Sequence, residues 1–247
     1  MVMMLLQDIL KVVIPLVVGA ILTWLTQKIG AIRLRTSRRK FWSGESREVN
    51  VVYGTREMDM TPFEKAEALK VDILNVVNVN DVISVVKASS YLHRLLSVSV
   101  KTQDEIESTK KGNFLIIGGP IANNVTKEFF GRINTSYEFN IVGKDVRQIV
   151  NKTGSFVASA KFDKDFNLIQ DVAWFYRGKN PYDEENVVII AAGCFGYGTE
   201  AVISYLISDE FYKQVKNKRI DTMEGVLEVG VKNGKTGQPN LISSVGL

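Results

Sequence analysis

The stretch Asn186-Val-Val-Ile-Ile-Ala-Ala192, followed directly by Gly193-Cys-Phe-Gly-Tyr-Gly-Thr199, is the strongest fold signal in this chain. A continuous apolar run of this length is typical of a strand buried on both faces, as parallel-sheet strands are. Residues 49–54 and 113–118 have the same form, since each apolar run ends in a glycine. The sequence therefore predicts an α/β fold with a Rossmann-like, mostly parallel sheet.

The connecting segments complete this prediction. Asp81 precedes apolar residues at helical spacing, beginning with Val82, Ile83, Val85 and Val86, and predicts a long helix.

The middle of the chain departs from the alternating pattern. Residues 155–162 and 166–176 flank Asp163-Lys-Asp165 and predict an antiparallel hairpin inserted into the sheet. A final strand is expected over 224–231, with a turn at Asn233-Gly234.

Three glycine-containing loops follow the three apolar strands, over residues 53–57, 118–124 and 193–199. In a parallel sheet such loops share the carboxyl edge, where open α/β folds bind ligands. Glycine allows close backbone approach to a ligand, and free amides at the start of a helix attract anions. This edge is therefore expected to bind a nucleotide or a similar anionic small ligand. The third loop reads G-x-x-G-x-G, which is neither the dinucleotide fingerprint nor a P-loop.

The candidate site residues come from these loops and from the start of the first long helix. A carboxylate base would be Glu57, Asp81 or Glu200. Each candidate also has an ordinary structural alternative: a tight turn for the glycines, a helix cap for Asp81, a surface ion pair for Arg56. The ligand-binding candidates are Thr55, Arg56, Asn80, Gly118, Gly119, Asn123, Asn124, Gly193, Gly196, Gly198 and Thr199.

Cys194 is the only cysteine and His93 the only histidine. An intrachain disulfide is impossible, and neither a Cys/His zinc site nor a haem is expected. Cys194 lies at a strand-to-helix turn, where a nucleophile elbow would place it, but its one possible histidine partner lies within a helix. A small packed side chain is the favoured interpretation of Cys194.

The N-terminal segment predicts a membrane anchor. Residues 9–29 are mostly apolar and are followed by a basic flank over 28–47. We expect residues 1–29 to form one transmembrane helix in contact with the lipid bilayer and 30–47 a basic juxtamembrane linker. Residues 48–247 would then form a cytoplasmic domain, with the N-terminus outside the cell membrane.

The net charge of +4 belongs to that flank and not to the expected domain. Residues 28–47 carry seven of the 31 basic side chains and one of the 27 acidic ones. Lys11 and Asp8 lie before the flank, which leaves 23 basic and 25 acidic residues in 48–247. A near-neutral domain argues against specific nucleic-acid binding.

One stretch resembles a known class of module. Gly118-Gly-Pro-Ile-Ala-Asn-Asn-Val-Thr126, with Ile141-Val-Gly-Lys-Asp145 downstream, is similar to Rossmann-like modules of microbial surface-layer and cell-wall-binding proteins. Those modules are exported, whereas the basic flank predicts a cytoplasmic domain, and the resemblance implies no site residue.

Three functions compete at this point. The preferred one is a single-pass membrane protein whose cytoplasmic domain acts as a ligand sensor or effector. The first alternative is a membrane-anchored nucleotide- or nucleoside-processing hydrolase that uses carboxylates. The second is a structural or assembly module of a membrane complex. Association into a homo-oligomer is compatible with all three. A shallow loop edge with a large apolar patch elsewhere would favour the assembly module.

Overall fold

The computed structural model describes the backbone of residues 2–59, 73–76, 78–106, 110–142, 145–216, 218 and 220–247. The side chains of residues 2–22, 56–59, 73–76, 141–142 and 145–147 lie outside this description. The chain divides into two compact units, Met1–Arg38 and Arg39–Leu247, and each is considered by itself.

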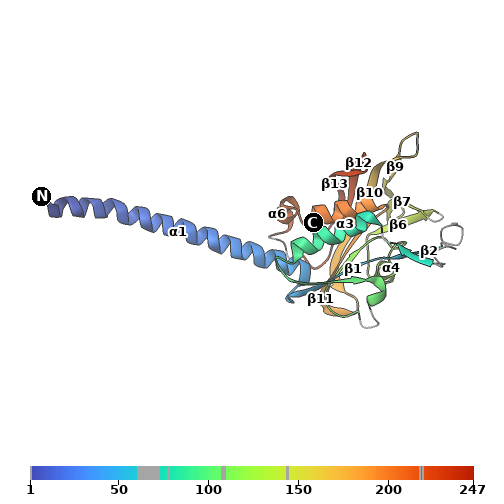
Figure 1. Ribbon diagram of the computed structural model, residues 1–247, viewed down its shortest axis with the longest axis horizontal. Helices are drawn as coiled ribbons and strands as arrows, with labels where there is room; N and C mark the ends of the chain where they lie inside the picture. The colour runs from blue at the N-terminus through green and yellow to red at the C-terminus, as the bar shows by residue number, and fades with distance from the viewer. Residues whose placement is uncertain are drawn as a thin grey trace. The chain divides into compact units, whose positions relative to one another are not determined.

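Helix α1 (Val2–Ser43) is one continuous helix that crosses the expected anchor boundary at residue 29 (Figure 1). No helix in the part of the chain that the structure describes is long and apolar enough to cross a membrane. Residues 9–22 of the predicted span lie outside the described side chains. The predicted transmembrane anchor at 9–29, and the single-pass membrane localisation derived from it, are therefore wrong. The physical reason is that six basic residues interrupt the apolar character of α1 beyond residue 22: Lys28, Arg33, Arg35, Arg38, Arg39 and Lys40.

The central sheet of the unit Arg39–Leu247 contains eight of the described strands (Figure 1). They are β1 (Glu48–Tyr53), β4 (Ser97–Thr102), β5 (Phe114–Ile117), β9 (Lys161–Phe162), β10 (Leu168–Asn180), β11 (Asp183–Gly193), β12 (Met223–Lys232) and β13 (Lys235–Val245). Their order is β13-β12-β10-β11-β5-β1-β4, with β9 paired to β10.

The sheet is mixed and mostly antiparallel, so the predicted Rossmann-like, mostly parallel sheet is wrong. Strands β4, β1, β5 and β11 run parallel to one another. The pairs β10–β11, β10–β12, β12–β13 and β9–β10 are all antiparallel.

Two short connections explain the antiparallel half. Only Pro181 and Tyr182 separate β10 from β11, and a link this short joins only antiparallel strands. Strands β12 and β13 meet at Asn233 and Gly234, whose φ angles of 51° and 68° suit a type I′ hairpin. The sequence pattern was misleading because β10 and β11 are long and buried, as parallel strands usually are.

The expected hairpin over 155–176 is divided between two sheets. Strand β8 (Phe156–Ser159) pairs with β7 (Asp145–Asn151), which pairs with β6 (Tyr137–Val142) in a separate three-stranded sheet. Strand β9 pairs with β10 across the turn at Asp163, whose carboxylate accepts hydrogen bonds from later backbone N–H groups. Strands β2 (Arg56–Asp59) and β3 (Ile73–Val76) form a third, two-stranded sheet.

Two apolar cores lie on the two faces of the central sheet. The first packs beneath helices α3 (Val79–Leu92), α5 (Gly196–Leu206) and α6 (Asp209–Val215). The second packs beneath helix α4 (Asn124–Phe130) and the β6–β7–β8 sheet. A 3₁₀ turn, η1 (Gln103–Glu105), follows β4. This layering leaves α3 and α5 side by side on one face (Figure 1).

Candidate functional site

The three glycine-containing loops lie at one edge of the sheet. Because β1, β5 and β11 are parallel neighbours, their carboxyl ends coincide, as predicted. A Cβ atom at Gly54 would collide with the carbonyl oxygen of Ala122, and one at Gly119 would lie 3.1 Å from that of Gly193. These glycines therefore allow the loops to pack against one another, which is the structural alternative for that residue type.

Polar side chains of this edge are engaged within the protein. Asn123 is fully buried; its Oδ1 accepts from the N–H groups of Val125 and Thr126 at 2.9 and 3.2 Å. Thr126 donates its hydroxyl to Gly118 O at 2.8 Å, and Thr199 Oγ1 accepts from Gly193 N–H at 3.1 Å. These side chains act as caps and loop braces.

The other predicted residues are spread along the edge. Thr55 donates to Asp104 Oδ2 at 3.2 Å, and the side chains of Arg56 and Glu57 lie outside the described residues. Asn124 lies in an open depression of about 630 Å³ along α4, which contains none of the other predicted residues.

The start of α3 also belongs to this edge. Asn78, and not Asp81, is the N-cap residue, and its Oδ1 accepts from the N–H of Asn80 at 2.9 Å. Asp81 is buried, with its carboxylate 3.6 Å from where a Cβ would lie at Gly118. A Cβ at Gly196 would collide with Asn78, so the first turns of α3 and α5 touch.

Asp171 is a buried carboxylate that the sequence analysis did not identify. It lies on β10 at the start of α5, where its Oδ1 accepts from the N–H groups of Val172 and Phe195 at 2.8 and 3.2 Å. Its Oδ2 accepts from Gly198 N–H at 2.5 Å. The chain thus places its own carboxylate at the helix start that was expected to bind a ligand anion. The signal in the sequence is one acidic residue next to the apolar run 172–176.

Nucleotide binding, predicted from these loops, therefore has no support among the described residues. Nor do three or more His, Cys, Asp or Glu side chains lie together in the described part of the chain to hold a metal ion. Cys194 packs against the second core, and burial raises the pKa of its thiol, which disfavours the nucleophilic thiolate.

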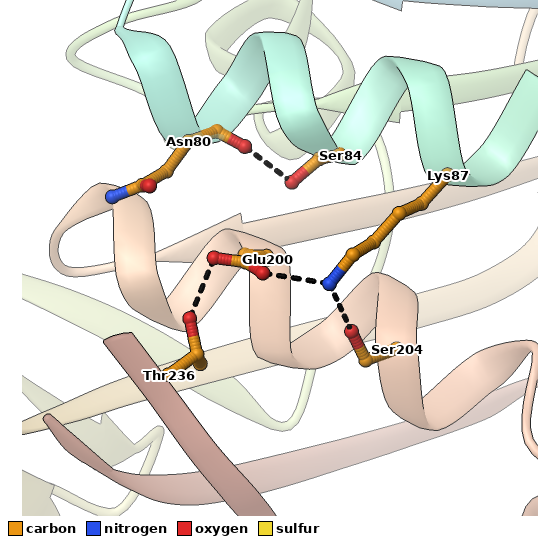
Figure 2. A network of polar contacts seen from close by, with 6 residues as sticks. All are labelled: Asn80, Ser84, Lys87, Glu200, Ser204 and Thr236. Carbon is orange, nitrogen blue, oxygen red and sulfur yellow. Dashed lines mark hydrogen bonds and ion pairs between the residues drawn. The ribbon is translucent and has the colours of Figure 1, made fainter. Parts of the chain in front are cut away.

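A polar network joins α3, α5 and β13 (Figure 2). Lys87 Nζ on α3 lies 2.6 Å from Glu200 Oε1 and 3.2 Å from Ser204 Oγ on α5. Thr236 on β13 donates to the other oxygen of Glu200 at 2.5 Å. Glu200, predicted as a carboxylate base, is thus paired with a lysine.

The first turns of helix α3 bury polar residues and expose apolar ones, whereas its second half buries Ala88 and Leu92 as an ordinary surface helix does. Its buried residues include Asn80, Asp81 and Ser84, where Ser84 Oγ donates to Asn80 O at 2.7 Å (Figure 2). The opposite face, which we call the outer face of α3, consists of Val79, Val82, Ile83 and Val86, with 69%, 43%, 37% and 58% of their surfaces exposed. Their spacing of three, one and three residues places them on a single stripe.

An open sheet edge lies next to this helix. Strand β4 is the last strand of the central sheet, and α3 packs against both β1 and β4. Val100 of β4 is 45% exposed. It lies two residues after Val98, which packs against the first core, so both point to the face that carries α3.

Comparison with known proteins adds no assignment: no protein-family model and no curated protein sequence matches this chain. The fold and the surface together define a mixed α/β protein with an apolar helix face beside an open edge strand.

Proposed function

We propose that this chain is an assembly module, in which copies associate through the outer face of α3 and the neighbouring edge strand β4. The observation that carries the proposal is the exposed apolar stripe on the first turns of α3. Single exposed apolar residues are ordinary, but a continuous stripe on one helix is typical of an interface. Burying it in an assembly would be favourable by about 25 cal/mol for each Å² of apolar surface.

A second copy of the same chain suits the outer face of α3 because none of its four residues is charged. The outer face of α3 consists of valine and isoleucine, and the charge of Lys87 is directed to Glu200. A two-fold contact brings the same patch of both copies together, so a charged patch would repel itself whereas this stripe does not. The polar network behind α3 holds the helix in place, so the stripe is already ordered before association.

The test replaces two valines of the stripe in the full chain, as Val82→Lys with Val86→Lys. In a two-fold dimer this change introduces four like charges and removes four apolar side chains from the interface. We expect the dissociation constant to rise by roughly 100-fold or more, measured by sedimentation velocity over a dilution series. Lysine is a good helix former, so the far-ultraviolet circular dichroism is expected to stay unchanged.

The matched control places the same two charges on exposed apolar residues elsewhere. Ile169 on β10 and Val245 on β13 are 45% and 47% exposed, and the double Lys variant there is expected to associate like the unmodified chain. An unmodified chain that stays monomeric at every concentration, or an α3 variant that associates normally, would disprove the proposed function.

A further inference from the structure

The free side of β4 has its backbone groups available for pairing. Ser97 N–H donates to Arg47 O at 2.8 Å, so Ser97 and Ser99 direct their backbone groups towards β1. Because successive residues of a strand alternate, Val98 and Val100 direct theirs away from the sheet. No described strand pairs with that side.

Strand β4 also lacks the usual protection of an edge. It contains no proline, its pairing with β1 has no register shift, and its one charged residue is Lys101. Natural edge strands are commonly blocked by charges, prolines or bulges. An edge with a single lysine and with no proline or bulge, beside an apolar helix, is suited to pairing with another strand.

We infer that two copies of this chain pair antiparallel through β4, around a two-fold axis at Ser99, so that one sheet runs through both copies. This inference rests on the proposed function and names the geometry of that association. In this register Val98 pairs with Val100 of the second copy, and the outward backbone groups of both residues are satisfied. Lys101 lies opposite Ser97 of the second copy, so no like charges face each other.

The helices support the same geometry. A two-fold axis perpendicular to the sheet keeps both α3 helices on the same face. Because α3 packs against β4 as well as β1 and β5, pairing through β4 places the two α3 helices on either side of the axis, above the joined sheet. We therefore expect one second copy to cover both the free side of β4 and the outer face of α3.

The test is a disulfide across the axis in the full chain. Ser99 of the two copies would form a non-hydrogen-bonded pair with Cα atoms about 4.5 Å apart, within the range that a disulfide bridges. Under mild oxidation with diamide, Ser99→Cys is expected to convert most of the chain into a covalent dimer. Ser97→Cys is the control: it is exposed on the same face of β4, but its two copies would lie about 14 Å apart, beyond disulfide reach.

The outcomes separate this inference from the proposed function. Cross-linking of Ser99→Cys at least tenfold faster than Ser97→Cys, and lost when the two α3 lysines are added, supports the register. Equal rates for the two cysteines, or no cross-link in a chain that still dimerises through α3, overturn the register and leave the proposed function standing. A monomeric chain without cross-links overturns both. The unmodified chain reports any contribution of Cys194, which is expected to be none because its thiol is largely buried.

Discussion

The free energy of unfolding is expected to fall by about 2.5 kcal/mol between pH 5 and pH 8 through the titration of Asp171. Burial raises the pKa of this carboxyl from 3.8 to about 7, against the opposing effect of three backbone N–H donors. The folded state therefore holds a proton that the unfolded chain has already released. The resulting stabilisation is complete below about pH 4 and is lost as the pH rises through 7.

Urea unfolding at several pH values, compared with Asp171→Asn, measures this effect. The amide cannot titrate, so the variant should lack this part of the pH dependence. Its stability at pH 5 is expected to be lower by roughly 1 to 3 kcal/mol, because one side of the amide presents a donor to a backbone N–H. A variant with the same slope as the unmodified chain between pH 5 and 8 would show that Asp171 does not titrate there.

Arg177→Met is expected to lower the free energy of unfolding by roughly 3 to 5 kcal/mol. Arg177 is buried on β10; its Nε donates to Phe41 O at 2.9 Å and its Nη1 to Ile220 O at 2.7 Å. Burial lowers its pKa to about 10, with the charge of Asp221 acting in the opposite direction, so the guanidinium stays charged at neutral pH. Methionine fills similar space but removes the Arg177 donors from the carbonyl groups of Phe41, which is buried, and of Ile220, which is half-buried.

The control for this prediction lies two residues along the same strand. Lys179 is well exposed, and its ion pair with Glu184 is long, at 3.7 Å. Lys179→Met should therefore change the free energy of unfolding by less than about 0.5 kcal/mol. Both variants are compared by urea unfolding at pH 7. A loss below about 1 kcal/mol for Arg177→Met would mean that water replaces the guanidinium without cost.

The loop edge was predictable because it depends on local pattern. Apolar strands that end in glycine were placed correctly at residues 49–54, 113–118 and 186–193, and their parallel pairing brings the loops to one edge. What the loops do was not predictable. A glycine that packs against another backbone segment looks the same in a sequence as a glycine that packs against a ligand. Only the three-dimensional structure distinguishes them, as the contact between Gly54 and Ala122 shows.

The carboxylate at that edge illustrates a second difficulty. Asp171 is one acidic residue in a strand. The backbone N–H groups of Phe195 and Gly198 that donate to its carboxylate lie more than twenty residues away in the sequence. The apolar N-terminal segment had the opposite problem. Its composition suggested a membrane span, but the basic residues that follow belong to the same helix and interrupt its apolar character.

Residue order alone established the near-neutral charge of residues 48–247 and the helix that contains Val82 and Val86, because neither depends on contacts between distant segments. Sheet direction and the polarity of α3 depend on contacts between distant segments. The two-residue link at Pro181 makes β10 antiparallel to β11, although its sequence is typical of a parallel strand. Glu200 of α5 pairs with Lys87 of α3. The valines of α3 remain on the surface, where we propose that the assembly forms.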